Sequence, residues 1–224
     1  MFDVTRLART VAIVPTYQNA TIGDFVLRLI CLGIGHVVLV VPQQEDAGII
    51  RLAMNNLMKT HPVAHRVSLV EKEFPRGGQA KSDMLNAGLD FVEDKLNQDI
   101  IDYVLMVSSA VLLEASHLER LMDDMKLPSN MVARLKIRGI GRTGEPVSLG
   151  TAYRHMLALY RRTVFSLDPR LHRFEDSDDD GDAWKHVLKT VTNYRAEESA
   201  NLPESLWVSL DQHRTPDEEI ADER

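Results

Sequence analysis

The feature that most constrains the fold is a regular alternation between two kinds of segment. Short, continuous apolar runs rich in valine, isoleucine and leucine predict buried strands, and longer stretches with apolar residues at helical spacing separate them. The predicted strands cover residues 10–18, 36–42, 65–72 and 102–109, and the helices cover 20–35, 45–60, 77–96 and 116–125. Strands that alternate with helices are joined by crossovers. The sequence therefore predicts an α/β fold with a mostly parallel, twisted sheet flanked by helices.

The pattern changes after residue 127. We expect a strand at 130–141, a strand followed by a short helix within 149–167, a helix at 182–191 and a last strand at 192–197. The tail 213–224 is charged and has almost no apolar content, so it is expected to be disordered. No linker divides the rest of the chain, and residues 1–212 are therefore expected to form a single domain.

Charge and cysteine content narrow the class of protein. The net charge of −7 over 224 residues argues against general nucleic-acid binding, which usually needs a basic face. The single cysteine, Cys31, excludes a disulfide within the chain and lies in an apolar run, so we expect it in the core. No stretch reaches the roughly 18 apolar residues of a membrane span, and no signal-peptide core is recognisable. These features predict a cytoplasmic protein without a membrane span.

The loops that follow the first four predicted strands are the candidate site. In a parallel sheet, ligands bind outside the carboxyl ends of the strands. Those ends read "PTYQN", "PQQED", "EKEFPRGG" and "VSSAV". We expect these four loops to converge on one edge of the sheet.

An acidic stretch, "RFEDSDDDGDAWKHVL" at residues 173–188, allows three interpretations. Asp176, Asp178 and Asp180 are spaced as in a calcium loop, but its twelfth position is Val187 instead of a bidentate acid, so an EF-hand of the usual kind fails. A looser metal site on the same three aspartates remains open. So do a catalytic carboxylate at the start of a helix, which the helix dipole would favour, and a solvated acidic loop.

Four segments together carry a resemblance to a known family. They are "VAIVPTYQNATIGDFVLRLI", "AKSDMLNAGLDFV", "DYVLMVSSAVLLEASHLERL" and "LYRRTVFSLDPRLHRFEDSDDDGDAWKHVL". In order and spacing the chain resembles the GT-A glycosyltransferases, in particular the inverting family 2, which uses nucleotide-sugar donors. The resemblance covers roughly residues 10–195 and implies a GT-A (Rossmann-like) fold that transfers a sugar to an acceptor the sequence does not identify.

The resemblance also implies roles for individual residues. The donor-binding positions would be Pro15, Thr16, Tyr17, Gln43, Lys81, Ser108, Ser109, Ala110 and His186. The family's E-D-x-D motif falls on Asp179, Asp180 and Asp182, with Asp180 as the base that deprotonates the acceptor hydroxyl. A second register, on Glu175, Asp176 and Asp178, is the alternative.

Two departures from the family pattern bear on the chemistry. Ser108, Ser109 and Ala110 stand where the family has a metal-binding D-x-D, and they provide no ionised oxygen for Mn²⁺ or Mg²⁺. Pro42 and Gln43 stand where the family has aspartates that contact the base.

The departures leave two hypotheses about function. One is a transferase that is metal-independent or uses metal atypically, with Lys81, Arg142 or Arg162 neutralising the leaving diphosphate. The other is a non-catalytic GT-A domain that serves as a binding or assembly module.

Overall fold

The main structural unit is a six-stranded sheet. The computed structural model describes residues 4–16, 21–43, 47–74, 80–109, 111–128, 130, 132–135, 137–140, 146–147, 157–166 and 208–210. The strands of the sheet are β1 (Thr10–Pro15), β2 (His36–Pro42), β3 (Val67–Lys72), β4 (Tyr103–Val107), β6 (Val132–Arg134) and β9 (Leu157–Arg161). Their order is β3-β2-β1-β4-β9-β6, and β1 to β4 run parallel while β9 runs antiparallel to both neighbours. The predicted α/β fold with a mostly parallel sheet is confirmed at this level.

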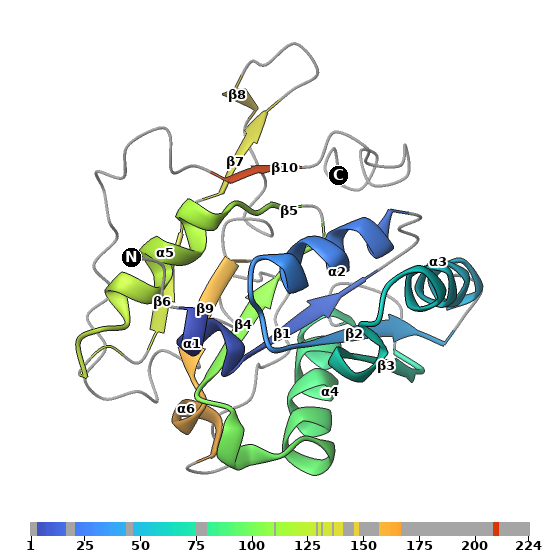
Figure 1. The fold of residues 1–224 in the computed structure, drawn as a ribbon, viewed down its shortest axis with the longest axis horizontal. Coiled ribbons are helices and arrows are strands. Elements are labelled where there is room, and N and C mark those ends of the chain that lie inside the picture. The colour runs from blue at the N-terminus through green and yellow to red at the C-terminus, as the bar shows by residue number, and fades with distance from the viewer. Residues whose placement is uncertain are drawn as a thin grey trace.

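Helices cover both faces of this sheet. They are α1 (Val4–Ala8), α2 (Ile22–Cys31), α3 (Ala47–Thr60), α4 (Ala80–Lys95), α5 (Ala115–Asp124) and α6 (Thr163–Ser166), with short 3₁₀ turns at Ala64–Arg66 and Gln98–Ile100. Figure 1 shows α2, α3 and α5 above the strands and α4 and α6 below them. All four helices predicted from apolar spacing before residue 127 are present.

The alternation of side chains along β1 explains why both faces need cover. Ala12 and Val14 belong to the core cluster formed with α2, α3 and α5. Val11 and Ile13 belong to the second cluster, formed with α4 and α6. Because successive residues of a strand point to opposite faces, an unbroken apolar strand contributes to two cores at once. The continuous apolar runs of the sequence are the direct consequence.

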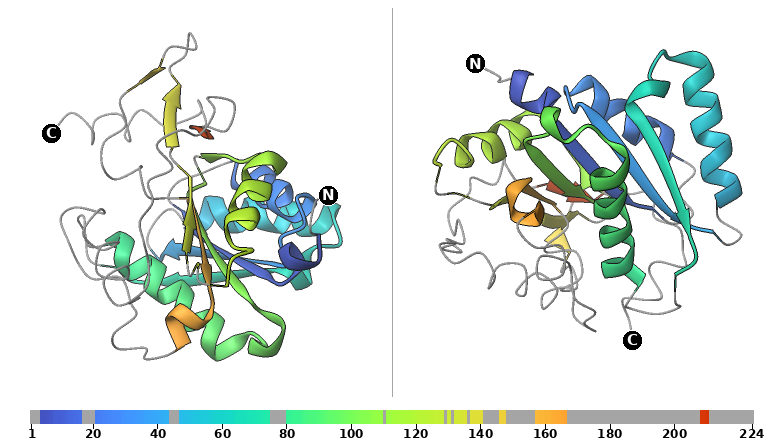
Figure 2. Two further views of the ribbon diagram at one scale, coloured as in Figure 1. Left: turned by 90° about the vertical axis from the view of Figure 1, so that its left-hand side faces the viewer. Right: turned by 90° about the horizontal axis from the view of Figure 1, so that it is seen from below.

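A second, smaller sheet lies beside the first and corrects one prediction. It consists of β5 (Val111–Leu112), β7 (Ile137–Ile140), β8 (Pro146–Val147) and β10 (Val208–Leu210), in the order β5-β10-β7-β8. The single strand predicted at 130–141 is wrong, since the chain there forms β6 in one sheet and β7 in the other. The two further views show β7 extending away from the six-stranded sheet (Figure 2).

The pairing partners of the chain change between β6 and β7. The N–H of Leu135 donates to the carbonyl of Leu157, where the partner strand β9 begins. After this hydrogen bond the chain continues into the second sheet, where β7 pairs with β8 and β10. The sequence prediction also omitted β10, whose only local signal is the apolar run "LWVSL" at 206–210.

The residues at the two ends of α2 show how the helix starts and stops, and its exposed side corrects one prediction. Gly33 adopts φ 103° and ends the helix, with the N–H of Ile34 bonded to the carbonyl of Leu29, as in a Schellman motif. The side chain of Thr21 makes no capping hydrogen bond. Cys31 is exposed instead of buried. It follows Ile30 directly, and the buried stripe recurs at three- and four-residue spacing, so Cys31 falls on the opposite side of the helix.

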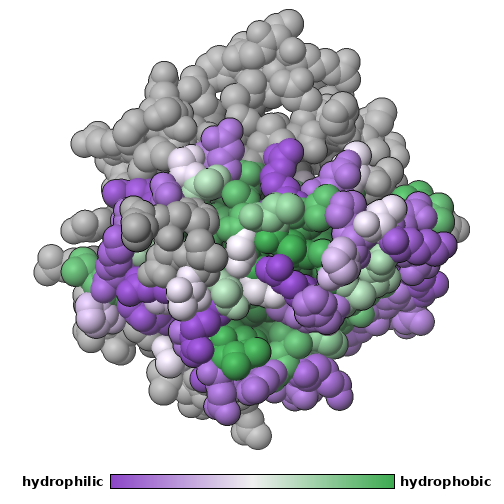
Figure 3. Space-filling view, in the orientation of Figure 1, coloured by the Kyte–Doolittle hydropathy of each residue, from purple (hydrophilic) through white to green (hydrophobic). Residues whose placement is uncertain are grey.

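The visible surface mixes hydrophilic and hydrophobic residues (Figure 3). The large apolar side chains exposed in the described part of the chain are Ile49, Leu52, Met58, Ile100 and Leu127. Within the described residues, no helix combines the length and apolarity needed to cross a membrane. The predicted helix at 182–191, the strand at 192–197 and the tail at 213–224 lie outside the described residues, and the single-domain assignment of 1–212 stays a prediction.

Candidate functional site

The candidate site lies at the edge of the main sheet where β1, β2, β3 and β4 end. These four strands are parallel, so Pro15, Pro42, Lys72 and Val107 end them on the same side. In the order β3-β2-β1-β4, the strands β2 and β3 lie on one side of β1, whereas β4 lies on its other side. Open α/β sheets bind ligands at such a switch point, outside the carboxyl ends of the strands.

The structure brings two predicted site segments together at this point. Ile13 of β1 is in register with Met106 of β4. Pro15 ends β1 and Thr16 follows it, while Ser108 and Ser109 follow the end of the adjacent strand β4. We call Ser108 and Ser109 the serine segment. The family positions for donor binding and for the D-x-D motif are therefore neighbours on adjacent strands.

The surroundings of Thr16 show how this part of the site is held. Its backbone N–H donates to the carbonyl of Val40 at 2.9 Å, and its hydroxyl donates to the carbonyl of Val14 at 3.2 Å. Thr16 is fully buried. The Thr16 side chain is thus bonded to its own strand, and the residue fixes the backbone where β1 ends.

The two residues of the serine segment differ in their exposure to a ligand. Ser108 is buried, while Ser109 is half-buried. The carbonyl of Ser108 accepts a hydrogen bond from the N–H of Val111 at 3.1 Å, which closes the turn into β5. Ser109 is therefore the residue of this pair that presents polar atoms nearer the surface.

Gln43 occupies the same edge one strand farther from β4. Its backbone N–H donates to the carbonyl of Lys72 at 2.9 Å, and the residue is exposed. Nearby, the Nε of Arg51 lies 2.6 Å from a carboxylate oxygen of Glu71. This hydrogen bond holds the pKa of Glu71 below its usual value. Glu71 is thus ionised and engaged by α3, and Gln43 is left as the exposed amide at this position.

Helix α4 starts on the carboxyl-edge side, because it follows β3 in a crossover to β4. Lys81 lies in its first turn, and the structure does not describe the Lys81 side chain. Gly88 has a packing explanation: a Cβ placed there would lie 3.1 Å from Cγ2 of Val40 and closer still to Cγ2 of Ile13. Gly88 lets α4 approach the sheet closely, and the ligand role of Lys81 stays a prediction.

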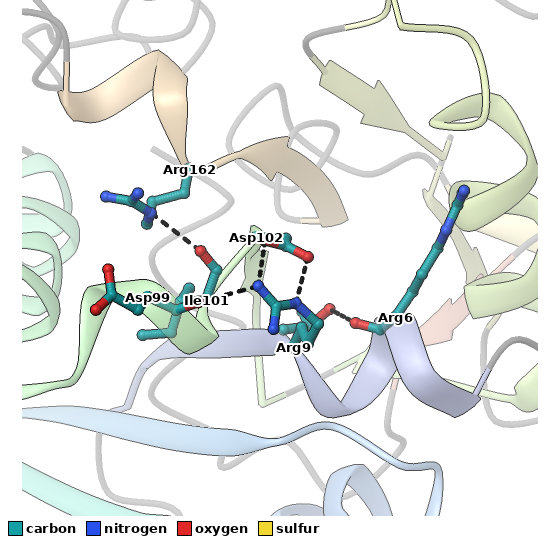
Figure 4. A network of polar contacts seen from close by, with 7 residues as sticks. Arg6, Arg9, Asp99, Ile101, Asp102 and Arg162 are labelled. Atoms are coloured by element: carbon teal, nitrogen blue, oxygen red, sulfur yellow. Dashed lines mark hydrogen bonds and ion pairs between the residues drawn. The ribbon is translucent and has the colours of Figure 1, made fainter.

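Arg162 lies away from this site, which corrects one part of the sequence-based hypothesis. Its Nε donates to the carbonyl of Ile101 at 3.0 Å and its backbone N–H donates to the carbonyl of Asp102. Figure 4 shows this contact beside the Arg9–Asp102 pair, before β4 begins. The five residues of β4 separate that end from the serine segment, a distance of about 17 Å at the usual rise per residue. Arg162 is thus at the wrong edge to neutralise a ligand at the site.

The Arg9–Asp102 pair joins β1 and β4 at this amino edge. Nε and Nη2 of Arg9 donate to the two carboxylate oxygens of Asp102 at 2.5 and 2.8 Å, and Nη2 also donates to the carbonyl of Asp99. The hydrogen bond from Arg9 holds the pKa of Asp102 below its usual value, and nearby Arg161 and Arg162 add to the effect. This cluster is a structural clamp at the edge opposite the site.

One buried polar residue, at the start of α5, was not singled out from the sequence. His117 is buried at the start of α5, and its Nδ1 accepts a hydrogen bond from the N–H of Glu114 at 3.0 Å. Since Nδ1 is the acceptor, it carries no proton in this arrangement. The ring fixes the turn between β5 and α5, and only its place three residues after Glu114 signals this in the sequence.

The described residues do not fit a family-type metal site. Ser108 and Ser109 have no ionised oxygen. Among the residues that the structure describes, no three histidine, cysteine or acidic side chains gather closely enough to hold a metal ion. Several predicted residues lie outside the described ranges, so their roles stay predictions: Tyr17, Ala110, Arg142, Asp176, Asp178, Asp179, Asp180, Asp182 and His186.

Comparisons with known proteins give distant structural likenesses alone. No family model matches the chain, and no curated protein matches it. Among solved structures, the chain is similar to HddC from Yersinia pseudotuberculosis, with a TM-score of 0.44 and 11% sequence identity over 81% of this chain and 99% of HddC. A likeness of this size carries no assignment of function.

Proposed function

We propose that this chain is a glycosyltransferase of the GT-A type that moves a sugar from a nucleotide-sugar donor to an acceptor without a D-x-D-bound metal. The observation that carries the proposal is that the parallel strands β1 and β4 end at the switch point of the sheet, with Thr16 and the serine segment following them on the same edge. This is where an α/β sheet of this order binds a nucleotide. The four sequence segments that resemble the family supply the kind of donor.

The proposed reaction is a single displacement at the sugar. The acceptor hydroxyl attacks the anomeric carbon, the bond from that carbon to the diphosphate oxygen breaks, and the hydroxyl proton passes to Asp180. The diphosphate leaves with the negative charge. Asp180 is assigned to this role from the sequence resemblance alone.

The diphosphate needs compensation that a metal would otherwise provide. Ser109 offers a hydroxyl and a backbone N–H at the end of β4, but neutral donors supply hydrogen bonds without net charge. The remaining positive charge is assigned to Lys81, at the start of α4, and to Arg142, both on sequence grounds. Gln43, exposed at the end of β2, is the candidate contact to the edge of the base.

A second candidate function is a non-catalytic GT-A domain that binds a nucleotide or a protein partner. The observation that favours it is the pair of hydroxyls at the serine segment, where the transferase family places its metal ligands. Both candidates use the same edge of the sheet. They differ in whether a bound donor is turned over.

Thermal unfolding in the presence of ligands tests donor binding. The panel consists of UDP, GDP, CDP, ADP and dTDP and the corresponding nucleotide sugars, each with and without Mn²⁺. We expect one nucleoside diphosphate to raise the melting temperature equally in both conditions. A shift that requires Mn²⁺ would refute the metal-independent form of the proposal, and no shift with any member would refute donor binding itself.

Turnover of the donor separates the two candidates. We expect slow release of the nucleoside diphosphate from the donor identified above, measured with water or simple sugars as acceptors. Asp180→Asn is expected to abolish this release with little change in melting temperature, while Asp94→Asn, on the exposed side of α4, leaves it unchanged. Donor binding without release in the wild type would favour the non-catalytic module. Equal release from Asp180→Asn and the wild type would show that Asp180 is not the base.

A further inference from the structure

Strand β10 pairs with β5, the strand that follows the serine segment, although the two are far apart in the chain. Leu210 pairs with Val111 and Ser209 pairs with Leu112 in an antiparallel arrangement. Val111 is the residue whose N–H closes the turn onto the carbonyl of Ser108. One backbone hydrogen bond and one ladder thus separate the C-terminal strand from the serine segment.

The order of the two sheets shows what β10 connects. In the main sheet β9 lies between β4 and β6, and in the second sheet β10 lies between β5 and β7. The strands β5 and β7 follow β4 and β6 in the chain, and β4 and β6 both run antiparallel to β9. Both therefore leave the main sheet from the carboxyl edge. Strand β10 bridges the two extensions that leave this edge.

The short length of β5 makes this bridge important. It contains two residues, and in the described sheet its pairing partner is β10. Two-residue strands have little stability of their own, because few hydrogen bonds offset the backbone entropy lost on ordering. The side chains of Val111 and Leu113 are buried in the core on one side. The ladder to β10 provides the described backbone pairing of this segment.

We propose that β10 is a positioning element for the candidate site, which holds the serine segment in place through backbone pairing with β5. The inference rests on the proposed function for the ligand, but its structural part does not. If β10 acts in this way, weakening its pairing with β5 also loosens the turn at Ser108 and increases the motion of the residues that face the donor. The effect depends on the backbone of Ser209 and is independent of its hydroxyl.

The test compares two substitutions of Ser209 in the full-length chain. Strand β10 has a partner on each side, so the N–H of Ser209 faces one ladder or the other, and Ser209→Pro removes it. Ser209→Ala keeps the N–H and is the matched control. The first readout is amide hydrogen exchange of the peptide spanning residues 108–113, with a peptide from residues 89–95 of α4 as the internal reference. This readout needs no ligand.

We expect exchange at 108–113 to become roughly tenfold faster in Ser209→Pro, in line with the loss of a backbone hydrogen bond and a strand contact. Exchange in the α4 peptide should stay at the wild-type rate in Ser209→Pro. In Ser209→Ala, both peptides should exchange at the wild-type rate. Unchanged exchange at 108–113 in Ser209→Pro would overturn the proposal. Should Ser209→Pro fail to fold, Ser209→Gly takes its place, because glycine weakens a strand while keeping the N–H. In that variant exchange at 108–113 should again be faster than in the wild type, by a smaller factor, while exchange in α4 is unchanged.

The second readout is the affinity for the nucleoside diphosphate identified by thermal unfolding. We expect Ser209→Pro to weaken this affinity by roughly tenfold, which corresponds to the loss of about one hydrogen bond to the ligand. Ser209→Ala should leave the affinity unchanged. Faster exchange with unaltered affinity would overturn the positioning role. If the wild type binds none of the nucleoside diphosphates, the proposed function fails by itself, and exchange at 108–113 decides whether β10 holds the serine segment.

Discussion

Replacing Gly88 by alanine tests how closely α4 is packed against the sheet. Gly88 lies in the middle of α4, where alanine has the higher helix propensity by about 1 kcal/mol. A Cβ at this position would lie 3.1 Å from Cγ2 of Val40 and closer to Cγ2 of Ile13. Propensity and packing therefore predict opposite signs for the same substitution.

The structure indicates that packing prevails. Ile13 and Val40 are fully buried, β-branched residues in the central strands β1 and β2, so their χ1 angles have little freedom to adjust. Overpacking of this kind costs about 1–3 kcal/mol, which exceeds the propensity gain over most of its range. The net destabilisation is therefore up to about 2 kcal/mol. In a chain of 224 residues this lowers the melting temperature by up to about 8 °C.

Urea and thermal unfolding of Gly88→Ala and Gly48→Ala measure the effect. Gly48 lies in the first turn of α3, and no atom lies within 4 Å of a Cβ built there. It is the matched control in which propensity acts without a steric term. We expect Gly48→Ala to be neutral or to stabilise the protein by up to about 1 kcal/mol, while Gly88→Ala destabilises it.

A double-mutant cycle with Ile13→Ala identifies the clash. Ile13→Ala removes the Cγ2 that the new Cβ would meet, so the double variant should be more stable than the sum of the single effects predicts, by about 0.5 kcal/mol or more. The reasoning is refuted if Gly88→Ala is as stable as Gly48→Ala, or if the two effects of the cycle add.

Two further predictions concern charged groups outside the site. Arg9 keeps the pKa of Asp102 low, so the pair stabilises the fold above the ordinary aspartate pKa of about 3.9 and ceases to do so as the pH falls through the lower folded value. Melting temperatures of Asp102→Asn and the wild type should therefore differ at pH 6 and converge towards pH 2, and a constant difference would contradict the assignment. His36 has its pKa lowered by burial and by Arg66 and His65, and its Nε2 lies 2.9 Å from the Ser68 hydroxyl. The contribution of neutral His36 to the free energy of unfolding should be complete above about pH 6.5. It should fall as the pH drops below this value, by at most about 1.4 kcal/mol per pH unit. In urea titrations, His36→Gln should reduce this dependence on pH.

The local features that the sequence determined are those in which a residue's neighbours along the chain decide its conformation. The apolar runs at 36–42 and 102–109 correspond to β2 and β4, and the helical spacing at 45–60 corresponds to α3. Gly33 ends α2 with a positive φ. In each case, a continuous apolar run, a helical repeat or a residue without a Cβ restricts the backbone locally.

The errors fall where a partner distant in the sequence decides the outcome. Cys31 lies in an apolar run, but the face of α2 that packs against the sheet excludes it. Arg162 was assigned to the diphosphate, yet antiparallel pairing carries β9 to the amino edge, where this arginine meets Ile101. Residue type alone does not reveal which edge a side chain reaches.

The candidate site shows the same division. The sequence alone identified Thr16, Gln43 and the serine segment as residues after strand ends, since buried strands are recognisable from their composition. Their relative positions, with Thr16 and the serine segment after adjacent strands and Gln43 one strand farther from β4, come from strand order and direction. The role of β10 belongs entirely to the tertiary structure. Pairing between residues about a hundred positions apart depends on the closure of the whole chain, and three residues of local sequence carry too little pattern to predict it.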